Sequence, residues 1–379
     1  MHIAIDYTPA LHQGAGIGRY TRELTAALAR IDTDNQYILF CAGVEPGLQA
    51  PNLPELPANF TVRATRISPR WLTIGWHRLR LPWPAEQLTG ECDVFHSPDF
   101  ALPPLRRARG VVTVHDLSFL RVPQCAEPSL RAFLERAVPR ALSRAAHVVA
   151  DSANTRKDLI ELLAIPPDKI TVVPAGVSHH FRPVRNNLQL AEVRARYHLP
   201  QWFILSVGTL EPRKNFPRLI SAFAQLRRHT GLPHELVIAG GEGWLFQDIY
   251  DRVAKEGLEG LVHFTGFVAE DDLPALYTLA DLMVYPSLYE GFGLPPLEAM
   301  ACGTPVVASN NSSLPETLGN AALLVDAEDT EAMADAMARV LGNANLRTRL
   351  SDLGRAQAAR FTWENAARTL LAVYHKVMR

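Results

Sequence analysis

Two glutamates flank a glycine-rich loop between Pro286 and Gly303, and this segment holds the residues best suited to bind a ligand. Glu290 precedes the loop, Glu298 follows it, and the loop itself consists of Gly291, Phe292, Gly293 and Leu294. A helix is expected to open near Pro296 and to stop at Gly303. Loop amides at a helix start favour an anion, whereas carboxylates accept hydrogen bonds from sugar or ribose hydroxyls. For Glu298 the alternative is a first-turn carboxylate that only complements the helix dipole.

A basic pair, Arg213-Lys214, follows a predicted strand at 203–207 and precedes a predicted helix. Arginine offers a fork of donors and lysine a point charge, so the pair suits a diphosphate. The alternative is a solvated pair at a helix start. Only five of the 38 basic residues are lysines, which weakens that alternative.

Two further candidate segments lie in the first half of the chain, each after a predicted strand. His115 and Asp116 follow the apolar run 111–114, where the side chains of an open α/β sheet face a ligand. A lone histidine more often has a structural role, so a functional and a structural role both stay open for His115. The run Gly14-Ala15-Gly16-Ile17-Gly18 has neither the dinucleotide spacing nor a P-loop lysine. It predicts either an anion-binding turn or a tight turn alone.

Short apolar runs alternate with amphipathic segments along the chain, which predicts doubly wound α/β architecture. The clearest runs lie at 3–5, 37–40, 111–114, 147–150, 170–173, 203–207, 236–239, 262–265, 282–285 and 305–308. Tyr20, Leu24, Ala27 and Leu28 share one helical face, and so do Leu219, Phe223 and Leu226. The pattern restarts after a strand-poor stretch, so we expect a linker near 175–200 and a ligand site between two α/β domains.

Composition excludes several classes of protein. With 379 residues, 47% hydrophobic and 20% charged, the chain predicts two globular domains rather than disorder. A net charge of −1 argues against a nucleic-acid partner. The sequence shows no apolar run of membrane-spanning length, no signal-peptide pattern and no C-x-x-C spacing, so we expect a cytoplasmic protein without zinc or disulfides.

Residues 63–83 combine five arginines with half of the six tryptophans, and the wider stretch 56–85 contains no acid. Arginine interleaved with tryptophan suits the surface of an anionic membrane or stacking on a saccharide. An arginine-rich surface over tryptophans of the core explains the pattern equally well.

The segment E-G-F-G-L-P-P-L-E resembles the signature of retaining family 4 glycosyltransferases. The early G-A-G-I-G-R-Y, then V-H-D, G-T-L-E-P-R-K-N and F-T-G-F-V resemble further motifs of that family, in the same order and over essentially the whole chain. Among its subgroups, the chain is most similar to bacterial mannosyltransferase-like members. The resemblance implies a GT-B fold, with an acceptor-side Rossmann-like domain at 1–180 plus 362–379 and a nucleotide-sugar domain at 181–361.

The resemblance also implies roles for residues. Glu298 is expected to hold the nucleotide ribose, and Glu290 a hydroxyl of the donor sugar. Arg213 and Lys214, with the amides of Gly293 and Leu294, are expected to hold the diphosphate, and Gly16 to meet it from the first domain. His115 is expected beside the transferred sugar, and Phe267 and Val268 against the base. Since Thr209 stands where many members have arginine, the diphosphate would depend on Arg213 and Lys214.

These expectations describe a retaining, metal-independent hexosyltransferase, with GDP-mannose as the expected donor and a glycan or lipid-linked saccharide as acceptor. No second carboxylate pairs with Glu290 as in a glycosidase, so a front-face reaction is favoured over a covalent intermediate. Arg213 and Lys214 can do the work of a metal ion, and no cofactor lysine is evident, so we expect neither a metal nor a bound cofactor. The alternative is a sugar-nucleotide epimerase or hydrolase on the same architecture.

Overall fold

The chain divides into two compact units in the computed structural model, which describes residues 1–14, 16–45, 53 and 55–379. Unit 1 comprises Met1–Leu117, Pro128–Gly176 and Thr362–Arg379, and unit 2 comprises Ser118–Glu127 and Val177–Phe361. The short segment Ser118–Glu127 therefore groups with unit 2. There the carbonyl oxygen of Cys125 accepts a hydrogen bond of 2.8 Å from Trp244 Nε1.

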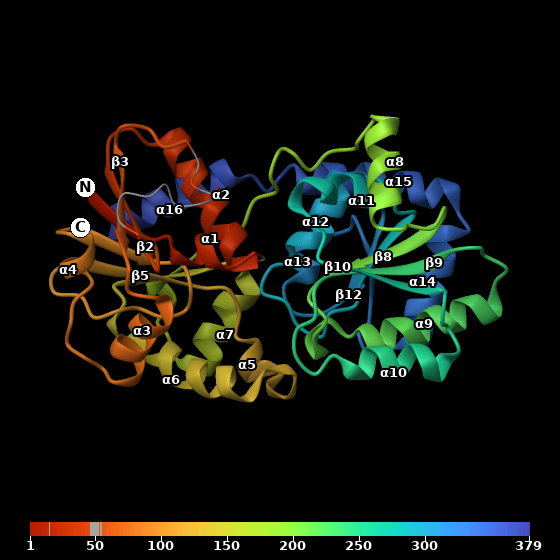
Figure 1. Ribbon diagram of the computed structural model, residues 1–379, viewed down its shortest axis with the longest axis horizontal. Helices are drawn as coiled ribbons and strands as arrows, with labels where there is room; N and C mark the ends of the chain where they lie inside the picture. Colours follow the sequence, from red (N-terminus) through yellow and green to blue (C-terminus); the bar gives the residue numbers. More distant parts are fainter. Residues whose placement is uncertain (15, 46–52, 54) are drawn as a thin grey trace. The chain divides into compact units, whose positions relative to one another are not determined.

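Parallel strands form one sheet in the described part of unit 1, in the order β3-β2-β1-β4-β5-β6-β7. Figure 1 labels β2, β3 and β5 of this sheet. The strands are β1 (His2–Asp6), β2 (Gln36–Ala42), β3 (Phe60–Thr65), β4 (Val94–Ser97), β5 (Arg109–Val114), β6 (His147–Ala150) and β7 (Ile170–Val172). Every residue of β6 is buried, which explains why such strands read as continuous apolar runs rather than alternating ones.

Helices flank this sheet. They are α1 (Thr8–His12), α2 (Gly16–Ile31), α3 (Pro69–Thr73), the π-helical turn η1 (Ile74–Arg78), α4 (Glu86–Thr89), α6 (Pro128–Arg144), α7 (Ala153–Leu163), η3 (Pro167–Lys169) and α16 (Trp363–Val377). The predicted apolar face of α2 is buried. The last helix, α16, packs against α2, and the ring centroids of Trp363 and Tyr20 lie 5.7 Å apart.

Unit 2 also contains a parallel sheet, ordered β10-β9-β8-β11-β12-β13 over its described residues. Figure 1 labels β8, β9, β10 and β12 of this sheet. The strands are β8 (Phe203–Val207), β9 (Glu235–Ala239), β10 (Val262–Gly266), β11 (Leu282–Tyr285), β12 (Val306–Ser309) and β13 (Leu323–Val325). Because β8, β11 and β12 are neighbours, the loops that leave their carboxyl ends must lie side by side. That edge of the sheet holds most of the residues predicted to bind the donor.

The helices and short turns of unit 2 are α5 (Ser118–Arg121), η2 (Pro123–Cys125), α8 (Asn187–Arg196), η4 (Pro212–Lys214), α9 (Phe216–His229), α10 (Gln247–Glu256), η5 (Glu270–Asp272), α11 (Leu273–Leu279), α12 (Leu294–Ala301), α13 (Leu314–Leu318), α14 (Thr330–Leu341) and α15 (Ala344–Ala358). The predicted face of α9, Leu219, Phe223 and Leu226, enters the core. The two parallel sheets confirm the expected α/β class.

Candidate active site

The loop after β8 carries the predicted basic pair into the interior of unit 2. Lys214 is only 9% exposed. Because lysine is almost never buried without a partner, a partner for its charge is expected nearby. The carbonyl oxygen of Arg213 accepts a hydrogen bond of 2.8 Å from the amide of Leu288, which ties this loop to the loop after β11. The neighbouring strand order thus explains why residues 75 positions apart in the sequence meet.

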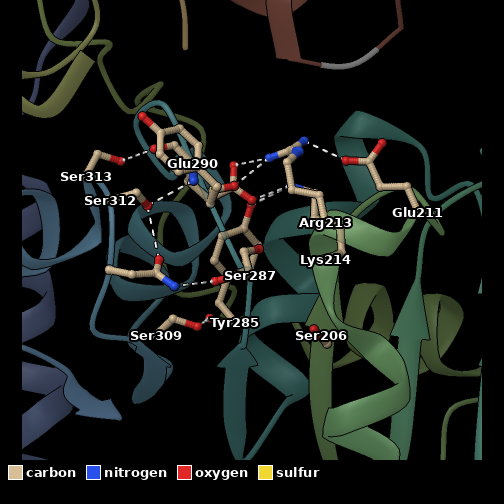
Figure 2. A network of polar contacts seen from close by, with 12 residues as sticks. Ser206, Glu211, Arg213, Lys214, Tyr285, Ser287, Glu290, Ser309, Ser312 and Ser313 are labelled. Carbon is tan, nitrogen blue, oxygen red and sulfur yellow. Dashed lines mark hydrogen bonds and ion pairs between the residues drawn. The ribbon is translucent and has the colours of Figure 1, made fainter. Parts of the chain in front are cut away.

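Glu290 lies between the two cations. Its Oε1 is 2.7 Å from Lys214 Nζ, its Oε2 is 3.0 Å from Arg213 Nη1, and Tyr285 donates a hydrogen bond of 3.0 Å to Oε1 (Figure 2). Burial alone would raise the pKa of Glu290, but the charges of Arg213 and Lys214 outweigh it and lower this pKa to about 2. Glu290 is therefore an anion at neutral pH.

A second carboxylate completes the cluster. Glu211, which is 3% exposed, accepts a hydrogen bond of 2.6 Å from Arg213 Nη2. Two cations and two carboxylates give this cluster a net charge of zero. An incoming diphosphate would have to share the cations with Glu211 and Glu290, so its binding depends on the placement of charges rather than on a bulk positive potential.

The main chain of Glu290 is fixed by serines that follow β12. Its amide donates a hydrogen bond of 2.9 Å to Ser312 Oγ, and its carbonyl oxygen accepts one of 3.0 Å from Ser313 Oγ (Figure 2). Thr317 Oγ1 donates to the carbonyl oxygen of Phe292 at 2.9 Å. The glycine-rich loop is thus held from a third strand end, which limits the movement of the Glu290 carboxylate.

Gly293 ends the loop in a left-handed conformation, with φ +97°, and α12 begins at the next residue, Leu294. The expected start near Pro296 is wrong by two residues, because Pro295 and Pro296 are both tolerated in the first turn of a helix. A Cβ on Gly293 would lie 2.7 Å from Leu314 Cδ2, so this position requires glycine. The amides of Gly293 and Leu294 therefore lie at the N-terminus of α12, where an anion is favoured.

Glu298 lies beyond the first turn of α12 as a result of that earlier start. It is 2% exposed, and its Oε2 accepts a hydrogen bond of 3.0 Å from the hydroxyl of Tyr277. A buried carboxylate in this position does more than complement a helix dipole, since that effect fades after the first turn. Its role as the ribose acceptor stays a prediction.

Phe267 and Val268 follow the last residue of β10. Phe267 is 67% exposed and Val268 is 6% exposed. A large exposed aromatic ring at the carboxyl end of a strand suits stacking against a planar base. The contact of Phe267 and Val268 with the base stays a prediction.

His115 follows β5 in unit 1 and uses both ring nitrogens. Nδ1 is 2.6 Å from Asp151 Oδ2, and Nε2 is 2.7 Å from the carbonyl oxygen of Pro98. The carbonyl oxygen of Pro98 can only accept, so Nε2 carries a proton, and Nδ1 carries a second one when Asp151 is ionised. Burial lowers the pKa of His115, but the Asp151 charge and hydrogen bond outweigh it and raise this pKa to about 9. The imidazolium has no lone pair, so in this state His115 is a fixed cation rather than a base.

The first-domain glycine loop continues into α2. Ala15 lies outside the described residues, and Gly16 has φ +32° with nothing within 4 Å of a Cβ placed on it. A Cβ on Gly18 would approach the carbonyl oxygen of Gln13 to 1.9 Å. Close packing therefore explains Gly18, whereas the predicted diphosphate contact of Gly16 stays a prediction.

The three tryptophans of the arginine-rich stretch differ in exposure. Trp76 is 7% exposed and donates a hydrogen bond of 2.8 Å from Nε1 to the carbonyl oxygen of Trp83. Trp71 is 66% exposed, and Leu79 is 65% exposed. The buried Trp76 fits a tryptophan of the core, whereas a contact of the exposed residues with a membrane or a saccharide stays a prediction.

Sequence reasoning missed the partners of the predicted residues. They are Asp151, Glu211, Tyr277, Tyr285, Ser312 and Ser313. Asp151 directly follows β6, and the two serines follow β12 after two asparagines. The signal that could have found these three was polar residues just after a buried strand.

Comparisons with known proteins agree with these features. The family described as Glycosyl transferases group 1 matches residues 193–357, and the family described as Glycosyltransferase Family 4 matches residues 14–181. The O-antigen chain mannosyltransferase B of Escherichia coli is 33% identical over 99% of this chain and 99% of its own length. The chain belongs to glycosyltransferase family 4. It also matches the serotype-specific mannosyltransferase WbdA of Escherichia coli, at 30% identity over 67% of this chain, but spans only 31% of WbdA.

Solved structures show the same fold. Sucrose-phosphate synthase from Thermosynechococcus elongatus superposes with a TM-score of 0.76 at 24% identity, covering 100% of this chain and 99% of that chain. HepE from Anabaena, in complex with UDP and glucose, gives a TM-score of 0.74 at 19% identity, with 99% of each chain covered. These matches confirm the GT-B architecture. In the described ranges of this family 4 glycosyltransferase, no helix is long and apolar enough to cross a membrane.

Proposed function

We propose that this glycosyltransferase transfers mannose from GDP-mannose to a hydroxyl of a glycan or lipid-linked saccharide, with retention of the anomeric configuration. The observation that carries the proposal is the cluster of Arg213, Lys214 and Glu290 beside the N-terminus of α12. It supplies cations for a diphosphate and a carboxylate for a sugar hydroxyl at one edge of one sheet. The choice of mannose rests on the mannosyltransferase relatives. The transferases among them do not favour an epimerase or hydrolase.

The two cations take the place of a metal ion in this proposal. When the bond between the sugar and the diphosphate breaks, negative charge grows on the departing phosphate oxygen. Arg213, Lys214 and the amides that begin α12 would stabilise that charge. Removing one such donor typically costs about 100- to 1,000-fold in kcat. We therefore expect activity to survive a chelator and to need no added cofactor.

Retention would follow from attack on the same face that the diphosphate leaves. In this proposal the departing diphosphate accepts the proton of the acceptor hydroxyl, because Glu290 is already occupied by Lys214 and Arg213. His115 would contribute as a buried cation near the reacting sugar, since both of its nitrogens donate internally.

The test is a panel of GDP-, UDP- and dTDP-sugars, incubated with the protein and a mixture of saccharide acceptors, with and without EDTA. Release of nucleoside diphosphate identifies the donor, and NMR of the glycoside gives the anomeric configuration. We expect GDP from GDP-mannose and an α-mannoside, in EDTA as well. An inverted product, or nucleoside diphosphate release that EDTA abolishes, would contradict the proposed mechanism.

We also propose that unit 1 contacts the cytoplasmic face of an anionic membrane, through exposed residues on and after α3 and η1. Trp71, Leu79 and Leu81 are exposed here, and so are the neighbouring Arg70, Arg78 and Arg80. Apolar side chains would enter the interface, and each arginine near the surface would contribute about 1 kcal/mol.

Co-sedimentation with vesicles that contain phosphatidylglycerol tests this contact. Replacing Arg70, Arg78 and Arg80 with glutamine should abolish sedimentation and leave donor hydrolysis intact. A matched control carries the same change at Arg106, Arg107 and Arg109, which are exposed in the same unit without exposed large apolar neighbours. Equal loss in both triple variants would show only a general charge effect.

A further inference from the structure

A cavity of about 470 Å³ opens in unit 1 where three neighbouring strands end. Asp6, Ala42 and Ser97, the last residues of β1, β2 and β4, all line it. Ligands of open parallel sheets bind at this edge. The volume lies within the range of about 300–1,000 Å³ that is typical of small-molecule sites.

Two of the polar groups that line the cavity are carboxyl groups. Asp6 and Asp99 both line it, and both are partly exposed. Asp6 Oδ1 accepts a hydrogen bond of 3.1 Å from the amide of Thr8, and Asp99 Oδ2 accepts one of 2.9 Å from Gln13 Nε2. These bonds fix the two carboxyl groups in place. Among the described residues that line the cavity, none is a lysine or an arginine.

Two histidines, His12 and His77, also line the cavity, and His77 adds no positive charge at neutral pH. Burial, with help from the charges of Arg144 and Arg140, lowers the pKa of His77 to about 4. The imidazole of His77 packs edge-on against Phe133, with ring centroids 6.2 Å apart. It therefore presents a neutral, polar edge to the cavity.

Aromatic side chains form part of the wall. Trp76, Phe100 and Phe133 line the cavity, and the hydrogen bond from Trp76 to Trp83 fixes the plane of the indole. Phe100 has φ +52°, a conformation that a bulky residue adopts only when its surroundings enforce it. Its ring lies 5.5 Å from that of His115. The cavity thus adjoins the histidine expected beside the reacting sugar.

We propose that this cavity binds the terminal sugar of an uncharged saccharide acceptor and excludes phosphorylated sugars. Sugar hydroxyls donate hydrogen bonds to Asp6 and Asp99, and the C–H faces of the ring pack on the aromatic wall. A phosphate would meet two carboxyl groups, and no lysine or arginine among the described residues lines the cavity to pair with it. This proposal rests on the proposed function, because the bound saccharide is an acceptor only if the protein transfers a sugar to it.

Binding without a donor tests the proposal apart from catalysis. Saturation-transfer NMR would measure the binding of neutral oligosaccharides that end in mannose, glucose, galactose or N-acetylglucosamine. The same oligosaccharides, phosphorylated on the terminal 6-hydroxyl, would be titrated in parallel. At least one neutral saccharide should bind ten or more times tighter than its phosphorylated counterpart. Equal or tighter binding of every phosphorylated form, or no binding of any neutral one, would overturn the proposal.

Asp99→Asn sharpens the test. Loss of a charge-assisted hydrogen bond should weaken the binding of the neutral saccharide by about 10- to 150-fold. The phosphorylated counterpart should bind tighter than it does to the wild type, an opposite change that a misfolded variant could not produce. Asp34→Asn, an exposed carboxylate outside the cavity, is the matched control and should change neither.

The outcomes separate the two proposals. Saccharide binding that depends on Asp99, without any release of nucleoside diphosphate from a nucleotide-sugar, would defeat the proposed function but not a saccharide site. Release of nucleoside diphosphate, together with a neutral saccharide that binds Asp99→Asn as tightly as wild type, would defeat the acceptor site alone.

Discussion

The His115–Asp151 pair makes the stability of the protein fall as pH rises through the neutral range. The pKa of His115 is about 9 in the folded protein, against an ordinary value of 6.5. A raised pKa means that the folded state holds the proton more tightly than the unfolded state. The stabilisation is therefore complete below pH 6.5 and is lost as the pH rises through 9.

The size of the effect follows from these two values. The full shift corresponds to about 3 kcal/mol in the free energy of unfolding. Most of this stabilisation remains at pH 7 and almost none at pH 9.5, so about 2–3 kcal/mol is lost between them. Asp151→Asn removes the charge that raises this pKa. The variant should be less stable than the wild type at pH 7, and its free energy of unfolding should not show this fall between pH 7 and pH 9.5.

Urea denaturation at pH 7 and pH 9.5 measures the effect. His147→Asn is the matched control, because His147 is also buried in this sheet but burial, with a minor contribution from the Lys376 charge, lowers its pKa to about 4. His147 is neutral throughout the range, so its variant should lose as much stability with pH as the wild type. If Asp151→Asn and wild type show the same change between the two pH values, His115 does not hold its second proton and the electrostatic argument is refuted.

Three further variants test the site. His115→Ala should lower kcat and leave the affinity for nucleoside diphosphate unchanged, and a variant that turns over at the wild-type rate would make His115 purely structural. Glu298→Gln keeps an acceptor for Tyr277 but loses the charge, so the donor KM should rise by about 10- to 150-fold, and unchanged affinity would remove the ribose role. Gly293→Ala should cost about 1–2 kcal/mol of stability through its left-handed backbone and weaken nucleotide binding, whereas Gly231→Ala, with open space around it, should do neither.

The strands predicted from continuous apolar runs are confirmed, because strands covered on both faces must be apolar throughout. Three strands were not among the clear runs: β3, β4 and β13. In the edge strand β3 (Phe60–Thr65), apolar residues alternate with threonines and an arginine. Strand β4 contains His96, whose ring forms hydrogen bonds with Tyr374 and Thr113. A polar residue that is satisfied only by residues far along the chain cannot be recognised from its own segment.

The candidate site shows the same division. Glu290, Arg213 and Lys214 could be selected from their motifs, and the sheet order brings them within hydrogen-bonding distance. Their mutual neutralisation could not be predicted, because it depends on which oxygen meets which cation across two loops. His115 could be selected too, but its protonation is set by Asp151, which is 36 positions away. The cavity of unit 1 had no single sequence signal, since its lining comes from many short segments.

The most direct test of the account is the affinity of Arg213 variants for a nucleoside diphosphate, measured by calorimetry with whichever of GDP, UDP and dTDP the wild type binds most tightly. Arg213→Gln should weaken binding by about 10- to 150-fold, and Arg213→Lys, which keeps the charge but loses the fork, should weaken it less. Arg228→Gln, which removes an arginine paired with Glu256 on the surface of the same unit, should bind as wild type does. Wild-type affinity in Arg213→Gln would contradict the claim that this cluster holds the donor diphosphate.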